Sequence, residues 1–375
     1  IILLTSESTY EAGTEISLKF SVSKAINPLL YCSNSYGSSI IKPISEGKIL
    51  TYNLPKHLSG KKGIVCWKLL HKVTSFSGQF TIVPQSKVTS IETYIGPPSI
   101  QAGGKDFSML VVIPTDNLDN PLPELTPVNV KHQFLSNEVI DTIKTKHLIA
   151  YKNIYSQNES GRILVSTECL NTNSKEFTVN VLPAIPTGFS ITAKRPHGYA
   201  DGNQLTTFQT SVLRDELDNI VSDGTFVTFV ITNEKGHVLK TFGATIKGVA
   251  TAKMIHPDYD SQWSIQAYVN GLAESNMINL NYQQAITDFD VQFSENNRAL
   301  TIGPLKSFMD QMIPDGLSVK LHVYKNNMII ESLKTTSTDG YARFKLKSDI
   351  FENNDYTFVV TTAGLEKTFK NKTLW

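Results

Sequence analysis

The chain has 375 residues, with 35 lysine and arginine residues against 34 aspartate and glutamate residues, and a formal net charge of +1. This balance gives no electrostatic reason to expect nucleic acid or an anionic membrane as a partner. No apolar run approaches the roughly 20 residues that span a bilayer, and the apolar residues 1–4 are too few for the core of a signal peptide. We expect a soluble chain that is long enough for about two to four domains.

Short segments rich in Val, Ile, Thr, Phe and Tyr run through the whole chain, and most of them alternate apolar with polar residues. Such alternation is typical of antiparallel strands with one buried face. In chain order the clearest segments are residues 15–23, 105–114, 204–213, 226–233, 263–270, 317–325, 341–347 and 356–362. Asp-Gly pairs follow or precede several of them and supply tight turns. The pattern predicts an all-β protein built from β-sandwiches.

An internal repeat divides the chain. YEAGTEISLKF from Tyr10, IQAGGKDFSMLVV from Ile100 and GYADGNQLTTFQTSV from Gly198 each place a small residue and a glycine before an alternating strand. The alanines of these segments, at positions 12, 102 and 200, are 90 and 98 residues apart. A repeat of this length is about the size of one β-sandwich domain.

A second marker of the repeat is an acidic turn between two strands. It contains Asp116, Asp215 and Asp310, which are 99 and 95 residues apart. Aspartate and asparagine side chains at such a turn bond their own backbone before the chain re-enters the core. We therefore interpret the marker first as a folding feature.

The repeat and the short junctions between strands predict four domains. Pro183 and Pro186 stiffen the second junction, which favours an elongated, semi-rigid array over a flexible string. The expected domains are an immunoglobulin-like or macroglobulin-like sandwich at 1–84, an immunoglobulin-like sandwich at 85–184, a third sandwich at 185–285 and an immunoglobulin-like sandwich at 286–375.

The third unit resembles a bacterial immunoglobulin-like domain of the invasin and intimin type, often called Big-1. The residues that carry this resemblance are Ala200–Gly202, Val212–Val221, Thr225–Ile231, Lys247–Met254 and Ile265–Leu272. The fourth unit keeps part of the pattern, the second keeps less, and the first resembles a general immunoglobulin or macroglobulin-like sandwich. Asp218-Asn219 stands where the family commonly has a Gly-Asn turn. The resemblance implies tandem immunoglobulin-like domains and does not by itself imply receptor binding.

The three cysteines allow one disulfide and no zinc framework. Cys32 and Cys66 both lie in expected strands of the first domain, so they either form a bridge or fill one core as small hydrophobic residues. Cys169 stands alone, and we expect it to be buried rather than reactive.

The sequence predicts no catalytic, cofactor or metal site, because no known catalytic or nucleotide-binding motif is present. In HPDYD, alternate residues of an extended segment could point His256, Asp258 and Asp260 one way as metal ligands. A polar connection into the next strand is the favoured interpretation of this segment. A calcium site at the domain junctions is the other possibility, and its candidate ligands are Asp116, Asp119, Asp215, Glu216 and Asp218.

Aromatic side chains could form a contact surface for a carbohydrate or a peptide, because rings stack on sugars and anchor interfaces. The candidates are Tyr94, Tyr151, Tyr155, Tyr199, Tyr259 and Trp263. Core filling would explain most of them equally well, and we expect Trp67 to be a core residue.

We therefore expect a non-enzymatic, extracytoplasmic protein of a bacterial cell envelope, located at the cell surface, on the outer membrane or in the periplasm. Its tandem domains would serve adhesion or bridge protein surfaces. One alternative is an accessory subunit of an outer-membrane secretion, assembly or motility complex that docks on a large outer-membrane protein. Another alternative is a polysaccharide-binding protein. We expect the binding energy to concentrate on exposed aromatic or apolar residues of the divergent first or second unit.

Overall fold

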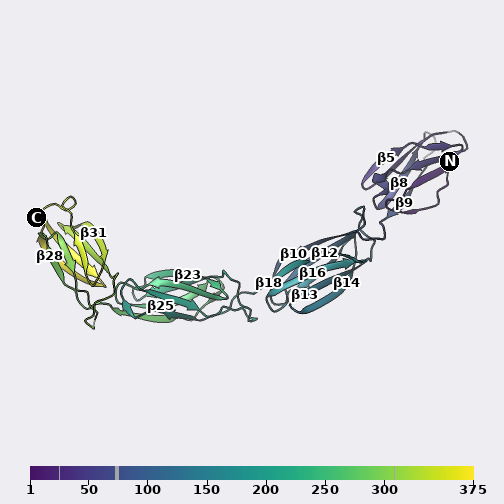
Figure 1. The fold of residues 1–375 in the computed structure, drawn as a ribbon. Coiled ribbons are helices and arrows are strands. Elements are labelled where there is room, and N and C mark those ends of the chain that lie inside the picture. The colour runs from purple at the N-terminus through teal and green to yellow at the C-terminus, as the bar shows by residue number, and fades with distance from the viewer. Residues whose placement is uncertain (25, 72–75, 308) are drawn as a thin grey trace. The chain divides into compact units, whose positions relative to one another are not determined.

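The computed structural model describes residues 1–24, 26–71, 76–307 and 309–375. In these residues every regular element is a strand except one short helix, α1 (Lys56–Ser59) (Figure 1). The all-β fold class predicted from the alternating segments is confirmed. The chain separates into two compact units, Ile1–Leu182 and Pro183–Trp375, and each unit is described by itself below.

Each unit contains two hydrophobic cores that follow one another along the chain. In the first unit the buried residues of the cores run from Ala12 to Ile82 and from Val88 to Val181. In the second unit they run from Phe189 to Tyr282 and from Ala285 to Leu374. We call the regions around these cores the first to fourth sandwich. The domain limits themselves and the elongated arrangement stay predictions.

The first sandwich packs two sheets around its core. One sheet has the strand order β1-β3-β7-β6, and the other has the order β2-β9-β8-β4-β5. The strands are β1 (Ile2–Leu3), β2 (Thr9–Glu11), β3 (Ser17–Ser21), β4 (Leu29–Asn34), β5 (Gly37–Ile41), β6 (Ile44–Glu46), β7 (Ile49–Asn53), β8 (Gly63–Leu70) and β9 (Phe76–Val83). Trp67 is a core residue, as predicted, and its ring meets that of Phe20 edge-on at 5.4 Å.

The second sandwich pairs a three-stranded sheet, β10-β12-β15, with a larger sheet, β11-β18-β16-β13-β14, in which β17 also pairs with β16. The strands are β10 (Ser90–Gly96), β11 (Ser99–Gln101), β12 (Phe107–Thr115), β13 (Pro127–Phe134), β14 (Asn137–Lys144), β15 (Ala150–Tyr155), β16 (Gly161–Cys169), β17 (Thr172–Asn173) and β18 (Phe177–Leu182). Cys169 is buried, as expected.

In the third sandwich the two layers join into one sheet, because β23 pairs with both β22 and β24. The strands are β19 (Ile191–Lys194), β20 (Tyr199–Ala200), β21 (Leu205–Thr210), β22 (Phe226–Asn233), β23 (Val238–Ile246), β24 (Val249–Ile255), β25 (Ser261–Val269), β26 (Ala273–Glu274) and β27 (Ile278–Gln284).

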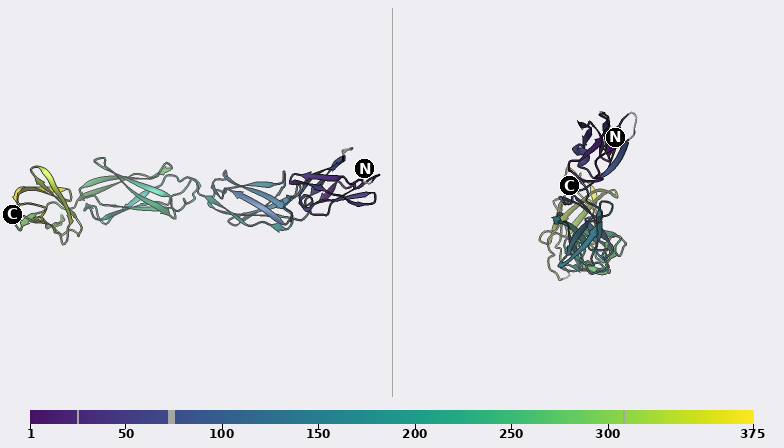
Figure 2. Two further views of the ribbon diagram at one scale, coloured as in Figure 1. Left: turned by 90° about the horizontal axis from the view of Figure 1, so that it is seen from above. Right: turned by 90° about the vertical axis from the view of Figure 1, so that its right-hand side faces the viewer.

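The fourth sandwich has a three-stranded sheet, β28-β29-β32, and a four-stranded sheet, β31-β30-β33-β34. Its strands are β28 (Val291–Ser294), β29 (Ala299–Ile302), β30 (Ser318–Lys325), β31 (Met328–Thr336), β32 (Ala342–Lys345), β33 (Asp355–Thr362) and β34 (Leu365–Thr373). Figure 2 shows the strands of the sandwiches from two further directions.

The repeated Ala-Gly segment has one structural role in three sandwiches. The short strand that ends at or just before the alanine pairs in parallel with the last strand of its sandwich, β2 with β9, β11 with β18 and β20 with β27. Ala12, Ala102 and Ala200 are all buried. The glycines then turn the chain with positive φ, for example 84° at Gly13 and 61° at Gly202, a backbone conformation that other residues rarely adopt.

Candidate functional site

Exposed aromatic rings gather on the outer face of the three-stranded sheet of the second sandwich. Strand alternation sends Leu110 and Val112 of β12 into the core, so their neighbours Phe107, Met109 and Val111 point outward. The same alternation turns Tyr94 of β10 outward. The sheet therefore presents a regular outer surface rather than scattered side chains.

The register of the strands brings these residues together. Tyr94 lies opposite Val111, and Val111 lies opposite Tyr151 of β15, which makes a row across all three strands. Phe107 lies opposite Tyr155, with ring centroids 5.4 Å apart. The two rows are four residues apart along β15, about 13 Å at the rise of a strand.

We call Tyr94, Phe107, Met109, Tyr151 and Tyr155 the aromatic face. Their exposed fractions are 59%, 36%, 40%, 61% and 51%. Among the described residues, the outward positions of these three strands hold no lysine or arginine. They hold one carboxylate, that of Glu92, which lies beside Tyr94. Aromatic residues and methionine with few charges are the composition of the centre of a protein interface.

The other aromatic candidates have structural roles. Trp263 is 2% exposed and packs on the ring of Tyr282 at 4.8 Å. Tyr199 packs against the core of the fourth sandwich. The hydroxyl of Tyr259 accepts a hydrogen bond from the side chain of Asn233 at 3.1 Å. The structure thus brings three of the six predicted residues together and adds Phe107 and Met109, which the outward alternation of β12 could have indicated.

The candidate disulfide between Cys32 and Cys66 is not formed, and both thiols are free. The two strands are neighbours, but Cys32 lies opposite Trp67 and Ser33 lies opposite Cys66. This shift of one residue places the cysteines on opposite faces of the sheet. Cys32 is buried in the core, where burial raises the pKa of its thiol to about 12, whereas Cys66 is exposed.

The proposed ligand group His256, Asp258 and Asp260 is not brought together. His256 is buried, Asp258 pairs with Lys320 of the fourth sandwich at 3.2 Å, and Asp260 is exposed. The segment is not a continuous strand, since β24 ends at Ile255 and β25 begins at Ser261. The alternation on which the metal hypothesis depended is therefore absent.

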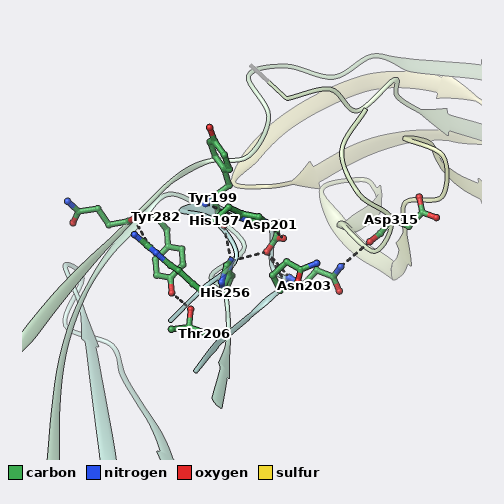
Figure 3. A network of polar contacts seen from close by, with 11 residues as sticks. His197, Tyr199, Asp201, Asn203, Thr206, His256, Tyr282 and Asp315 are labelled. Carbon is green, nitrogen blue, oxygen red and sulfur yellow. Dashed lines mark hydrogen bonds and ion pairs between the residues drawn. The ribbon is translucent and has the colours of Figure 1, made fainter. Parts of the chain in front are cut away.

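His256 instead lies beside His197 and Asp201, far away in sequence (Figure 3). The Nδ1 atom of His256 lies 3.4 Å from Oδ1 of Asp201, and Nε2 of His197 lies 3.4 Å from Oδ2. The repeated turn positions Asp201, whose Oδ1 accepts hydrogen bonds from the backbone N–H groups of Asn203 and Gln204, both at 3.1 Å. The turn can be recognised in the sequence, but the sequence does not show that the two histidines lie beside it.

The backbone of Tyr199 indicates which protons these histidines carry. Its N–H donates to Nδ1 of His197 at 3.2 Å, which places the proton of the neutral ring on Nε2. Its carbonyl faces Nδ1 of His256 at 3.1 Å, which favours a proton on that nitrogen. Both ring N–H groups then face the Asp201 carboxylate. A metal ion at these two nitrogens would require each ring to carry its proton on the other nitrogen, against the contacts of the Tyr199 backbone, so this arrangement disfavours a metal.

The surroundings of His256 favour its neutral form. Burial lowers its pKa most, and His197 and Arg195 lower it further, against the opposing effects of Asp201 and the Tyr199 carbonyl. Its Nε2 atom is buried and has no hydrogen-bond partner among the described residues. A second proton there would find no acceptor.

The acidic turns hold the chain at the sandwich junctions instead of gathering calcium ligands. The carboxylate of Asp116 accepts hydrogen bonds from the backbone N–H of Gln85 at 3.0 Å, of Leu118 at 2.8 Å and of Asn120 at 2.9 Å. The side-chain amide of Asn120 donates to both of its oxygens. Burial raises the pKa of Asp116, but these hydrogen bonds together outweigh burial and hold it below its usual range.

Asp215 repeats this arrangement in the third sandwich. It accepts from Ala184 at 2.7 Å, from Leu217 at 2.9 Å and from Asn219 at 2.9 Å. The oxygens that calcium would need already have N–H donors. The remaining calcium candidates do not join them, because Asp119 and Glu216 are exposed and Asp218 pairs with Arg214 of its own turn.

The fourth sandwich departs from the repeat at this turn. Asp310 has a φ of 60°, which matches 58° at Asp119 and 68° at Asp218 rather than the buried aspartates. The position of the buried aspartate is taken by Ser307, whose N–H donates to the carbonyl of Gln311 at 2.8 Å. The equivalence of Asp310 with Asp116 and Asp215 predicted from spacing is therefore wrong by three residues.

Comparison with known proteins identifies the fold. No family model matches the chain, and no curated protein matches its sequence. Among solved structures, the crystal structure of invasin, a bacterial integrin-binding protein, matches with a TM-score of 0.51 and 12% identity over 100% of this chain and 78% of that chain. FdeC, an Escherichia coli adhesin, matches with a TM-score of 0.50 and 12% identity over 75% of this chain and 95% of its own. The chain thus has the tandem immunoglobulin-like fold of these adhesins, and at this identity the likeness concerns fold alone. No helix of the described chain is long and apolar enough to cross a membrane.

Proposed function

We propose that the protein is a non-enzymatic adhesion module of a bacterial cell envelope, which binds a protein surface through the aromatic face of its second sandwich. The observation that carries this proposal is the gathering of four exposed rings and a methionine on one regular sheet face. The tandem immunoglobulin-like fold supports it by analogy with invasin and FdeC. The strand and turn order of the third sandwich supports placing the chain with the Big-1 domains.

The physical argument for the aromatic face is its combination of apolar area and rigidity. Tyrosine and phenylalanine side chains have two χ angles, so they lose little conformational entropy on binding. The strands fix their backbone, so the face needs no rearrangement before it meets a partner. Exposed apolar patches of this kind are unusual on soluble domains unless they bind something.

The test replaces the four rings with serine: Tyr94→Ser, Phe107→Ser, Tyr151→Ser and Tyr155→Ser in the full chain. Fluorescently labelled protein is added to cultured mammalian cells and to bacterial cells, and bound label is measured by flow cytometry. We expect binding to fall at least tenfold, because truncation of one hot-spot residue, a class in which tyrosine is enriched, costs about 2 kcal/mol or more. Thermal unfolding followed by far-ultraviolet circular dichroism checks that the fold is intact.

The matched control changes the exposed, stacked pair Phe226 and Phe242 of the third sandwich to serine. This variant removes a similar kind of surface and should bind as the unchanged protein does. Binding that survives the four-ring change, or that the control change abolishes, contradicts the proposal. Loss of binding after glycosidase treatment of the cells, but not after protease treatment, would instead support the polysaccharide alternative.

A further inference from the structure

A cleft of about 310 Å³ lies between the third and fourth sandwiches, within the second compact unit. The third sandwich contributes the side chains around its repeated turn, including Tyr199 and Asp201. The fourth sandwich contributes an apolar wall that includes Met309, Met312 and Ile313. We call this site the junction cleft. Clefts at domain interfaces with apolar walls and a few converging polar groups are the usual form of a binding site.

Direct contacts between the two sandwiches hold the junction cleft open. The side-chain amide of Asn203 donates to the carbonyl of Asp315 at 3.0 Å (Figure 3). On another side, Lys320 pairs with Asp258 at 3.2 Å. The side-chain amide of Gln284 donates to the carbonyl of Ala363. The walls are therefore preformed, and a ligand need not order them.

The polar end of the junction cleft is acidic. Asp201 is the one Asp, Glu, Lys or Arg residue among the described residues that line it. Its Oδ1 atom has two backbone N–H donors at 3.1 Å. Among the described residues, its Oδ2 atom has one neighbouring donor, Nε2 of His197 at 3.4 Å, which is long for a charge-assisted hydrogen bond of about 2.7–2.9 Å. This oxygen keeps capacity for a further, closer donor.

The shape and the charge together define a ligand. The volume lies at the lower end of the range for ligand sites, about 300–1,000 Å³, which suits one long side chain rather than a folded segment. An aliphatic stem would pack on the methionine wall, while a cationic tip would reach Oδ2 of Asp201 beside the ring of Tyr199. We propose that the junction cleft binds an arginine or lysine side chain of a partner polypeptide.

The test titrates N-acetyl-arginine amide into the full chain labelled with ¹³C-methyl methionine and records methyl spectra by nuclear magnetic resonance. The chain has six methionines, and two of them line the junction cleft. We expect saturable shifts of the Met309 and Met312 signals, assigned with single leucine replacements, while the other four methionine signals stay unchanged. N-acetyl-citrulline amide, which has the same shape without the charge, should bind at least tenfold more weakly. The lysine analogue should bind like arginine.

Two variants test the role of the carboxylate. Asp201→Asn keeps an oxygen for the two backbone donors but removes the charge, so it should abolish the preference for arginine over citrulline. Asp260→Asn, an exposed change on the same sandwich and outside the lining, should leave that preference unchanged. Equal binding of the two probes to the unchanged protein, or no saturable shift at the two methionines, overturns the proposal whatever the stability of the variants.

This inference is independent of the adhesive role of the second sandwich. The four-ring serine variant should bind the arginine probe as the unchanged protein does. Loss of cell binding with retained probe binding would therefore separate the two sites.

Discussion

Replacing Asp116 with alanine should loosen the start of the second sandwich. The aspartate is 1% exposed and accepts hydrogen bonds from three backbone N–H groups and from the Asn120 amide. The donors on Gln85 and Leu118 are only partly buried, so water can replace the carboxylate there. The two donors of Asn120 are buried and would be left unpaired. At about 1.5 kcal/mol for each hydrogen bond to a charged group, the loss should be about 3 kcal/mol.

The effect should reach the first sandwich as well. Asn120 accepts a hydrogen bond from the backbone N–H of Lys62 at 2.9 Å and donates to the carbonyl of Gly60 at 3.0 Å. Both contacts cross from the second sandwich to the first. An Asn120 side chain that has lost its anchor on Asp116 should therefore hold this junction less tightly.

Native-state hydrogen exchange measured by mass spectrometry is the suitable assay, because it reports the free energy of opening segment by segment. We expect faster exchange in residues 60–63, 85–90 and 114–122, with little change in the third and fourth sandwiches. Asp119→Asn, an exposed change in the same turn that tolerates the positive φ, is the control. Protection lowered by less than about 0.5 kcal/mol in the alanine variant, or equally lowered in the control, would refute the reasoning.

The two remaining predictions concern single residues of the first and third sandwiches. Cys66 should react with a maleimide in the native protein, whereas Cys32, buried and with its pKa raised to about 12, should react only after denaturation; a non-reduced, denatured sample that takes up fewer than three labels would show a disulfide. His256 has a lowered pKa in the folded chain, so below about pH 6.5 the unfolded chain binds a proton that the folded chain resists, and the third sandwich should lose stability as the pH falls. Melting of the third sandwich is followed between pH 8 and pH 5 by Trp263 fluorescence, in a chain whose other two tryptophans, Trp67 and Trp375, are replaced by phenylalanine. It should show this slope, and His256→Gln should reduce it; an unchanged slope would assign the pH dependence to other groups.

Local patterns in the sequence were sufficient to predict the fold class and the positions of the repeated Ala-Gly turns. Strand alternation identifies which side chains face a core, because successive residues of a strand point to opposite faces. It correctly placed Trp67 in a core. The repeated Ala-Gly segment also has a local cause, since glycine adopts positive φ without steric cost.

Register and long-range contacts needed the tertiary structure. Alternation within β4 and β8 could not tell that Cys32 faces Trp67 rather than Cys66, and one residue of register decides which face a side chain occupies. Likewise, spacing along the chain placed Asp310 with the buried aspartates, whereas the backbone shows Ser307 in that position.

The candidate sites also combine features that local patterns predict with features that only the tertiary structure shows. The outward position of each residue in the aromatic face is a local property of β10, β12 or β15, but the neighbour relations that make them one surface come from sheet pairing. The junction cleft depends still more on tertiary structure. Asp201 and Met312 are more than a hundred residues apart. They line one site because contacts between the third and fourth sandwiches bring them together, and no local pattern specifies those contacts.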